Sequence, residues 1–324
     1  MRRRLVKIVA IVMVLIVCAS GGLYFFARYE FTKIVVAEPG PTGRRVHEHG
    51  VFANYFPTKS RAAAVLLLGG SEGGISTPMN DVAKTLQAAG YSVLVASYFG
   101  AKGQPKTLES IPLETFDRAL AWLRTRPEVD PSRIVIAGIS KGAEAALLVA
   151  TRHPELRAVV AGVPSSVVWP GIRFPSLRTP SSWTVAGRPL PVVPYGPFRF
   201  GMVLGNVGSV YRDGLKHLAQ HPDAVIPIEK IKAPVLLICG KADKLWPSCP
   251  MSRQIEARAK SHEGPSVKVL AYANAGHACV GPPSTRNDPF FVKMILGGTD
   301  AGNRAARADG WPKILAFVRA ALDG

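Results

Sequence analysis

A serine lies between two glycines in the pentapeptide "GISKG", residues 138–142. A serine hydroxyl is a useful nucleophile only when a neighbouring base takes its proton. The apolar run "RIVIA" before it is typical of a buried strand, and "KGAEAALLVA" after the Ser140 turn has the composition of a helix. Small residues on both sides permit a sharp strand-to-helix turn that exposes the hydroxyl. The pattern therefore predicts Ser140 as a nucleophile, against the alternative of an ordinary glycine turn.

An acid and then a base follow Ser140, which is the chain order found in folds that carry a nucleophile on a strand-to-helix turn of this kind. Asp243 comes after the apolar run "PVLLICG", and His277 comes after "SVKVLAY". Because parallel strands end at one edge of a sheet, we expect the three side chains to converge there. His277 would accept the serine proton, and Asp243 would orient the imidazole and stabilise its charged form. Asp223 and Asp288 are the alternative acids, but neither directly follows a buried strand.

A tetrahedral oxyanion needs two backbone amide donors. The amide of Lys141, the residue after the nucleophile, is the first candidate. The second is expected in the loop after the early strand, within "LLLGGSEGG", where Ser71 is the first choice and Glu72 the second. Glycines there allow the backbone to approach closely. A plain glycine-rich turn is the alternative.

The elements around these residues alternate between apolar runs and amphipathic stretches. Buried strands are expected at "RAAAVLLLGG", "YSVLVASYFG", "LRAVVAGVP" and "APVLLICG", with helices at "MNDVAKTLQAAG", "LETFDRALAWLRTR" and "MSRQIEARAKSH". This alternation predicts a mostly parallel sheet with helices on both faces, in one α/β domain over residues 31–324.

The alternation stops at about residues 164–230, where proline, glycine and aromatic residues predominate. A structureless loop of this length would be unusual, so we interpret the segment as a cap inserted over one end of the sheet. Its aromatic residues are predicted to line an acyl pocket: Trp169, Phe174, Trp183, Tyr195 and Phe198. The alternative is a structural lid without substrate contact, because aromatic residues more often fill cores.

The four cysteines suggest one bridge. Cys249 follows Asp243 by six residues and Cys279 follows His277 by two, and the two loops must meet for the three side chains to converge. We therefore predict a disulfide between Cys249 and Cys279 outside the cytoplasm. Cys239 is interpreted as a buried strand residue, and the absence of a CxxC pair argues against a metal site.

Residues 1–30 are predicted to be a membrane anchor or signal segment. The run from 8 to 27 is apolar over about 20 residues, long enough to cross a bilayer as a helix. Arginines at 2–4 and Lys7 favour a cytoplasmic N-terminus, which places the rest of the chain outside. We expect one uncleaved transmembrane helix, with two alternatives: cleavage around Cys18, which would release a secreted domain, and a lipoprotein signal acylated at Cys18.

The net charge is +18, from 40 Lys and Arg against 22 Asp and Glu. These cations are spread along the chain, and outside the N-terminus no dense basic cluster or nucleic-acid-binding motif occurs. We interpret the charge as a bias in composition and expect no nucleic-acid partner.

Several motifs resemble one family. "GISKGAE", "VPSSVVWPG", "IPIEKIKAPVLLICGKADKLWPS" and "NAGHACVGPP" are similar to the C-terminal catalytic domain of acyl-CoA thioesterases and bile acid-CoA:amino acid N-acyltransferases. The resemblance runs from about residue 50 to the C-terminus and implies an α/β-hydrolase fold. It implies a nucleophile, acid and base at Ser140, Asp243 and His277. A serine suits hydrolysis, whereas the acyltransferases use cysteine. The family's long N-terminal β-sandwich is missing here.

The sequence therefore predicts a membrane-tethered serine hydrolase that cleaves an acyl thioester, or an ester, without a cofactor. A carboxylesterase or lipase acting outside the cytoplasm is the second reading. A non-catalytic binding protein that kept the fold is the third. Chain-length preference and oligomeric state stay open.

Overall fold

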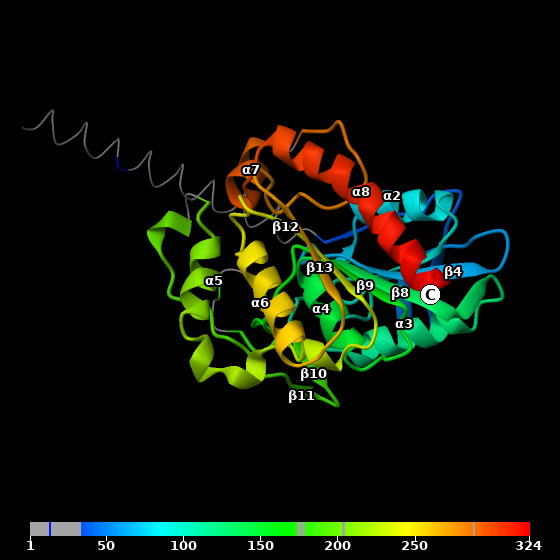
Figure 1. Ribbon diagram of the computed structural model, residues 1–324, viewed down its shortest axis with the longest axis horizontal. Helices are drawn as coiled ribbons and strands as arrows, with labels where there is room; N and C mark the ends of the chain where they lie inside the picture. Colours follow the sequence, from blue (N-terminus) through cyan, green and yellow to red (C-terminus); the bar gives the residue numbers. More distant parts are fainter. Residues whose placement is uncertain (1–12, 14–33, 174–175, 177–178, 203–204, 288) are drawn as a thin grey trace, which may run out of the picture.

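The computed structural model describes residues 13, 34–173, 176, 179–202, 205–287 and 289–324 (Figure 1). The strands are β1 (Val35–Val36), β2 (Arg44–Glu48), β3 (Val51–Phe56), β4 (Ala62–Leu68), β5 (Gly74–Ile75), β6 (Ser92–Ser97), β7 (Ile111–Pro112), β8 (Val129–Ile139), β9 (Ala158–Gly162), β10 (Trp183–Val185), β11 (Arg188–Pro189), β12 (Val235–Gly240) and β13 (Val267–Tyr272). The α-helices are α2 (Thr77–Ala88), α3 (Glu114–Arg124), α4 (Lys141–Ala150), α5 (Gly208–Leu215), α6 (Ser248–Ser261), α7 (Phe290–Leu296) and α8 (Asp300–Asp323). Short 3₁₀ helices are η1 (Phe200–Met202), η2 (Leu218–Gln220), η3 (Pro222–Ala224) and η4 (Ile228–Lys230).

In the described part of the chain, an eight-stranded sheet has the order β13-β12-β9-β8-β4-β6-β3-β2. The pairs β2–β3 and β3–β6 are antiparallel, and the other neighbours run parallel. The chain adds β6 on one side of β4 and β8 on the other, so the order reverses between β4 and β8. Open α/β sheets bind ligands outside the carboxyl ends of their strands at such a reversal. Ser140 directly follows β8.

Neighbouring residues of each central strand bury on opposite faces of the sheet. Leu66 and Ile136 pack in a core with residues of α3, α4 and α6, whereas Leu67 and Val135 pack in a second core with residues of α2 and α8. Because helices cover both faces, these strands read as continuous apolar runs in the sequence. The mostly parallel sheet with helices on both faces is thus confirmed.

The segment between β9 and β12 leaves the sheet. It contains β10, β11, α5 and the four 3₁₀ helices, and α5 lies beside α6 in Figure 1. It has a hydrophobic cluster of its own, built around Trp169, Val193 and Tyr211, against which Trp246 of the sheet domain packs. β10 also pairs with β7 in a small separate sheet, which ties this segment to the chain before α3.

Among the described residues, no helix is both long enough and apolar enough to cross a membrane. The predicted anchor or signal segment, residues 1–30, lies outside the described residues apart from Met13. That prediction therefore stays a prediction.

Candidate active site

Ser140 joins β8 to α4 in a strained conformation, with φ 57° and ψ −121°. A positive φ is unfavourable for a residue with a Cβ, so the surrounding structure must hold it. A Cβ on Gly138 would lie 2.1 Å from the Gly142 carbonyl oxygen, and a Cβ on Gly142 would lie 2.1 Å from the Gly69 carbonyl oxygen. Both glycines are therefore required by close backbone contact. The expected strand, turn and helix are present, and Ser140 lies at the positive end of α4.

A buried ion pair lies behind this turn. The Lys141 ammonium is 3.0 and 2.9 Å from the two carboxylate oxygens of Glu144, and both side chains are almost fully buried. Glu144 Oε1 also accepts hydrogen bonds from the Trp169 amide at 3.1 Å and from Trp183 Nε1 at 2.8 Å. Burial lowers the pKa of Lys141 and raises the pKa of Glu144, and the attraction between the two opposes both effects. The Lys141 side chain thus anchors the turn. The backbone amide of Lys141 lies at the N-terminus of α4, where amides lack intrahelical acceptors.

Asp243 lies in the loop after β12, residues 240–248, which we call the acid loop. Its Oδ1 accepts hydrogen bonds from the amides of Leu245 at 3.0 Å and Trp246 at 3.3 Å. Its Oδ2 accepts one from the Ser248 hydroxyl at 2.7 Å and lies 2.9 Å from His277 Nδ1. Four partners therefore hold a carboxylate that is only 2% exposed.

His277 is fixed on one side and free on the other. Its Nδ1 meets Asp243, its amide donates to the Leu296 carbonyl at 2.8 Å, and its ring makes an edge contact with Trp246. Among the described residues, none forms a hydrogen bond with its buried Nε2. The structure thus joins the predicted base to the predicted acid, but it contains no hydrogen bond between Ser140 and His277.

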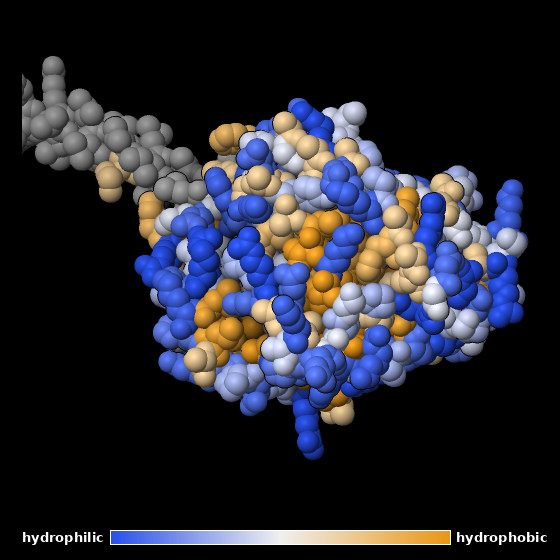
Figure 2. Space-filling model, viewed as in Figure 1, coloured by the Kyte–Doolittle hydropathy of each residue, from blue (hydrophilic) through white to orange (hydrophobic). Residues whose placement is uncertain are grey.

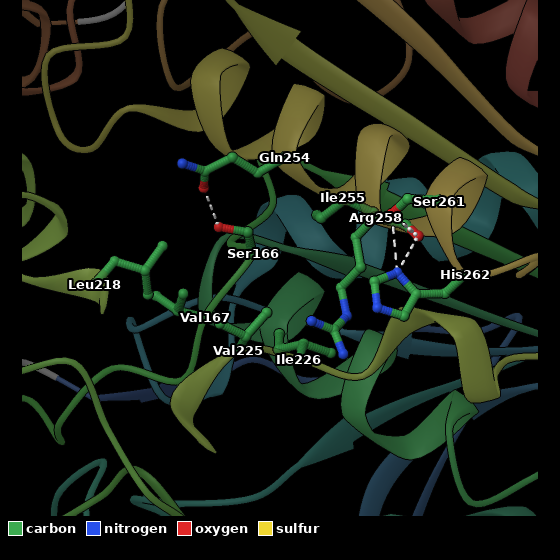
Figure 3. Close-up of a pocket in the computed structure, with 10 residues that line it drawn as sticks. All are labelled: Ser166, Val167, Leu218, Val225, Ile226, Gln254, Ile255, Arg258, Ser261 and His262. Carbon is green, nitrogen blue, oxygen red and sulfur yellow. Dashed lines mark hydrogen bonds between the residues drawn. The ribbon is translucent and has the colours of Figure 1, made fainter. Parts of the chain in front are cut away.

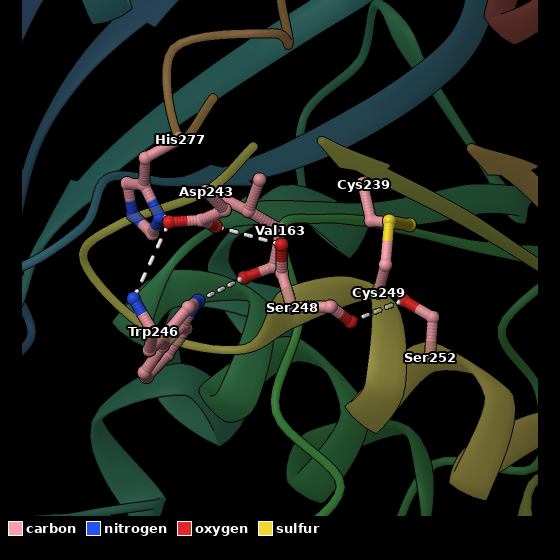
Figure 4. The surroundings of a disulfide bond; sticks show 8 residues. All are labelled: Val163, Cys239, Asp243, Trp246, Ser248, Cys249, Ser252 and His277. Carbon is pink, nitrogen blue, oxygen red and sulfur yellow. Dashed lines mark hydrogen bonds and ion pairs between the residues drawn. A yellow bond between two sulfur atoms is a disulfide. The ribbon is translucent and has the colours of Figure 1, made fainter. Parts of the chain in front are cut away.

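The predicted disulfide between Cys249 and Cys279 is wrong. Cys249, in the first turn of α6, is bonded to Cys239 of β12, with the two Cα atoms 5.1 Å apart (Figure 4). Cys279 is a buried free thiol, and burial raises its pKa to about 12. The two residues lie on opposite faces of the sheet. Cys279 packs in the core on the face covered by α2 and α8, whereas α6, which carries Cys249, covers the other face. The actual bridge closes the acid loop around Asp243, as Figure 4 shows.

The loop after β4, residues 69–74, is called the glycine loop here. Tyr98, directly after β6, donates its hydroxyl towards the carbonyl oxygens of Gly69 at 2.8 Å and Gly70 at 2.6 Å. A Cβ on Gly70 would lie 3.2 Å from the Ser140 Cβ, so the loop lies directly beside Ser140. Ser71, the first predicted amide donor, is exposed in this loop.

Glu72, the second predicted donor, brings its own carboxylate into this region. Cβ atoms placed on Gly69 and Gly70 would lie 2.7 and 2.9 Å from its two carboxylate oxygens. Although the residue as a whole is exposed, burial of its carboxyl group raises the pKa of Glu72. Hydrogen bonds from the amides of Glu72 and Gly70 and from the Ser76 hydroxyl act in the opposite direction, as does the charge of His277.

The sequence profile of the family described as "BAAT / Acyl-CoA thioester hydrolase C terminal" matches residues 111–324, more than half of the chain. The chain belongs to this family. The resemblance drawn from the motifs is therefore confirmed, and the match includes Ser140, Asp243 and His277.

The names of curated proteins similar to this chain agree with the family profile. Mouse acyl-coenzyme A thioesterase 6 is 26% identical over 301 residues, which are 88% of this chain and 67% of that protein. Rat acyl-coenzyme A amino acid N-acyltransferase 2 is 28% identical over 302 residues, 87% of this chain and 66% of that protein. The first is named as a thioesterase and the second as an N-acyltransferase, and these are the two enzyme groups named by the resemblance.

Solved structures share the fold at low identity. A putative dienelactone hydrolase from Klebsiella pneumoniae has a TM-score of 0.50 at 15% identity and covers 83% of this chain and 92% of its own. An α/β hydrolase from a deep-sea metagenome library, MGS-M1, has a TM-score of 0.52 at 16% identity, with coverages of 87% and 98%. The family member therefore has the α/β-hydrolase fold.

The aromatic residues of the predicted acyl pocket have different places. Trp169 and Trp183 are completely buried and bind Glu144, so they fill the core and present no surface to a ligand in this structure. Tyr195 stacks on Trp169 with 5.8 Å between ring centroids, and Phe198 is 62% exposed. Phe174 lies outside the described residues. For the two tryptophans, the alternative of a structural cap describes the observed packing better.

Four residues that matter at the site were not predicted: Tyr98, Glu144, Trp246 and Ser248. Glu144 lies three residues after Lys141 in a helix whose other residues are small or apolar, which is a signal that the two charges are paired. Ser248 and Trp246 follow Asp243 closely enough for local hydrogen bonds, a common arrangement after aspartate. Nothing in the sequence around Tyr98 marks its contact with the glycine loop.

A separate hollow lies between α6 and the cap residues 218–226, and hydrophobic side chains are visible on the face shown in Figure 2. It encloses about 230 Å³. Figure 3 shows the side chains that line it, among them the apolar Val167 and Ile226 and the charged Arg258. Ser140, Asp243 and His277 are not among its lining residues, so it is not part of the candidate active site.

Proposed function

We propose that this family member is a serine hydrolase that cleaves an acyl thioester or ester through an acyl-enzyme on Ser140. Ser140 attacks the carbonyl carbon while His277 takes the hydroxyl proton, which it then gives to the leaving thiolate or alkoxide. Asp243 keeps the imidazole in the tautomer with Nε2 unprotonated and stabilises the imidazolium. Water activated by His277 then attacks the acyl-enzyme and releases the acid.

One observation supports this proposal above the others. The Asp243–His277 pair is fully assembled, and it leaves one buried nitrogen, Nε2, with no partner among the described residues, at the same sheet edge as the strained Ser140. Buried polar atoms are normally hydrogen-bonded, so a buried Nε2 without a partner at this place needs an explanation. Catalytic hydrogen bonds are often long without substrate and shorten in the substrate complex. The Ser140 hydroxyl is the partner that the proposed reaction supplies.

The substrate class rests on the relatives, whose names specify acyl-CoA thioesterases and acyl-CoA amino acid N-acyltransferases. An acyl thioester is therefore the first candidate. The second candidate is an oxoester outside the cytoplasm. The disulfide between Cys239 and Cys249 favours it, because structural disulfides persist in oxidising compartments, where CoA esters are scarce. We also propose that residues 1–30 tether the domain to a membrane with the site outside the cytoplasm, and that cleavage would make it a secreted enzyme.

Hydrolysis of palmitoyl-CoA and p-nitrophenyl palmitate by the full chain in detergent separates the two substrates. Thioester hydrolysis that is lost in Ser140→Ala supports the first candidate, and ester hydrolysis alone supports the second. Wild-type chain that neither hydrolyses these substrates nor reacts with a fluorophosphonate at Ser140 would instead be a binding protein, which refutes the proposal. The intact mass of the purified chain shows whether the N-terminal segment is retained, cleaved or lipidated.

A further inference from the structure

The glycine loop orients its peptide groups in one direction. Tyr98 lies within hydrogen-bond distance of two successive carbonyl oxygens, those of Gly69 and Gly70. Within a trans peptide, the amide points away from its carbonyl. The amides of Gly70 and Ser71 are therefore turned away from Tyr98, and Gly70 faces Ser140 on its open side.

The Glu72 carboxylate occupies this open side. The position of a Cβ on Gly70 is 2.9 Å from Glu72 Oε2 and 3.2 Å from the Ser140 Cβ, so the carboxylate and the nucleophile lie on the same side of Gly70. Burial raises the pKa of this carboxyl group, and the amides of Gly70 and of Glu72 itself act in the opposite direction. Burial raises the pKa of Tyr98, and the negative charge of Glu72 raises it further.

These amides are the kind of donor that a tetrahedral oxyanion needs. Backbone donors aimed at an oxyanion stabilise it because they are fixed before the reaction. A donor that already binds a carboxylate is unavailable to a second anion, and two negative charges side by side repel each other. The carboxylate and the oxyanion therefore compete for one small region beside Ser140.

We propose that the Glu72 carboxylate blocks the amide donors of the glycine loop in the free enzyme. It must move away from them before a substrate carbonyl can bind there. This inference rests on the proposed nucleophile Ser140. The exposed position of Glu72 leaves room for that movement. Glu72 thereby lowers the reactivity of the free site and favours substrates whose binding displaces it.

The test compares the rate at which a fluorophosphonate labels Ser140 in wild type, Glu72→Ala and Glu72→Gln. This probe phosphorylates the nucleophile with loss of fluoride and directs a phosphoryl oxygen at the oxyanion donors. We expect Glu72→Ala to label about tenfold faster, with a similar rise in kcat/KM for the ester, because free donors become available to the transition state. Glu72→Gln, which removes the charge but keeps the size, should show a smaller increase.

Asp81→Ala is the matched control, since Asp81 is an exposed acid on α2, the helix that follows the glycine loop. It should label at the wild-type rate. Labelling of Glu72→Ala that is equal to or slower than that of wild type overturns the inference, because Glu72 would then be neutral or helpful to catalysis. That result leaves the proposed function intact as long as wild type labels at Ser140. Absence of labelling in every form defeats the proposed function instead.

Discussion

The acid loop and the glycine loop both follow a parallel strand at the carboxyl edge of the sheet, but they are held in different ways. In the acid loop, four partners and the Cys239–Cys249 bridge fix Asp243. In the glycine loop, Tyr98 holds two carbonyls, while Ser71 and Glu72 are exposed. In the proposed mechanism, His277 and Asp243 must keep one geometry throughout the reaction. In the same mechanism, the glycine loop must instead admit the substrate oxygen. The difference would then separate a fixed proton-transfer system from an adaptable anion site.

The largest effect is expected when the acid loop loses its charge. Asp243→Asn can place an amide nitrogen against His277 Nδ1, which stabilises the tautomer that cannot accept the serine proton. We expect kcat to fall about 10⁴-fold. Asp223→Asn, at an exposed alternative acid, is the control and should keep wild-type kcat. Equal activity of the Asp243→Asn and wild-type enzymes in steady-state ester hydrolysis would remove Asp243 from the mechanism.

The buried ion pair between Lys141 and Glu144 is expected to stabilise the Ser140 turn. Lys141→Met leaves the Glu144 carboxylate buried without its cation, which we expect to lower the free energy of unfolding by about 3–5 kcal/mol. The double variant Lys141→Met/Glu144→Gln restores a neutral acceptor for Trp169 and Trp183 and should recover most of the loss. Urea unfolding of the single and double variants measures this. A single variant as stable as wild type would show that the pair does not hold the turn.

Removal of the disulfide leaves the acid loop, like the glycine loop, without a covalent bridge. Cys249→Ala opens a ring that spans ten residues of sequence separation, and we expect a loss of about 2–3 kcal/mol in the free energy of unfolding. We also expect a lower kcat, because Asp243 loses part of its support. Cys279→Ala removes a buried free thiol and keeps the bridge, so it controls for packing. If the two variants match in stability and kcat, the bridge does not brace the site.

The smallest expected effect comes from a single contact of Asp243. Ser248→Ala deletes the 2.7 Å hydrogen bond to Oδ2 and leaves the other three partners. A hydrogen bond to a charged group contributes about 1.5 kcal/mol, which corresponds to about a tenfold lower kcat. Ser252→Ala, which removes a hydroxyl bonded to a helix carbonyl in the same α6, is the comparison and should leave kcat unchanged. A drop of equal size in both would point to α6 rather than to Asp243.

The sequence predicted the strand–turn–helix around Ser140, and it placed Asp243 and His277, which the structure brings into contact, at the ends of two further strands. These residues could be predicted because each depends on a local pattern, a buried strand followed by a polar residue, and because parallel strands end at one edge. The sheet and its helices could be predicted for the same reason, since strands buried on both faces are continuously apolar.

Side-chain partners distant in sequence could not be predicted with the same rules. The disulfide depends on which face of β12 Cys239 occupies. Alternation with Leu237, which packs on the α6 face, carried that information. Glu144 accepts hydrogen bonds from the Trp169 backbone amide and the Trp183 indole, which lie 25 and 39 residues away in the sequence. The approach of the Glu72 carboxylate to Gly70 depends on the glycine-loop conformation that Tyr98 holds.

Mass spectrometry of the full chain, quenched during turnover of p-nitrophenyl palmitate, tests the central claim most directly. The account predicts an acyl group on the peptide that contains Ser140, and its absence in Ser140→Ala together with loss of hydrolysis. An adduct on another residue, or hydrolysis that continues undiminished in Ser140→Ala, would contradict the account.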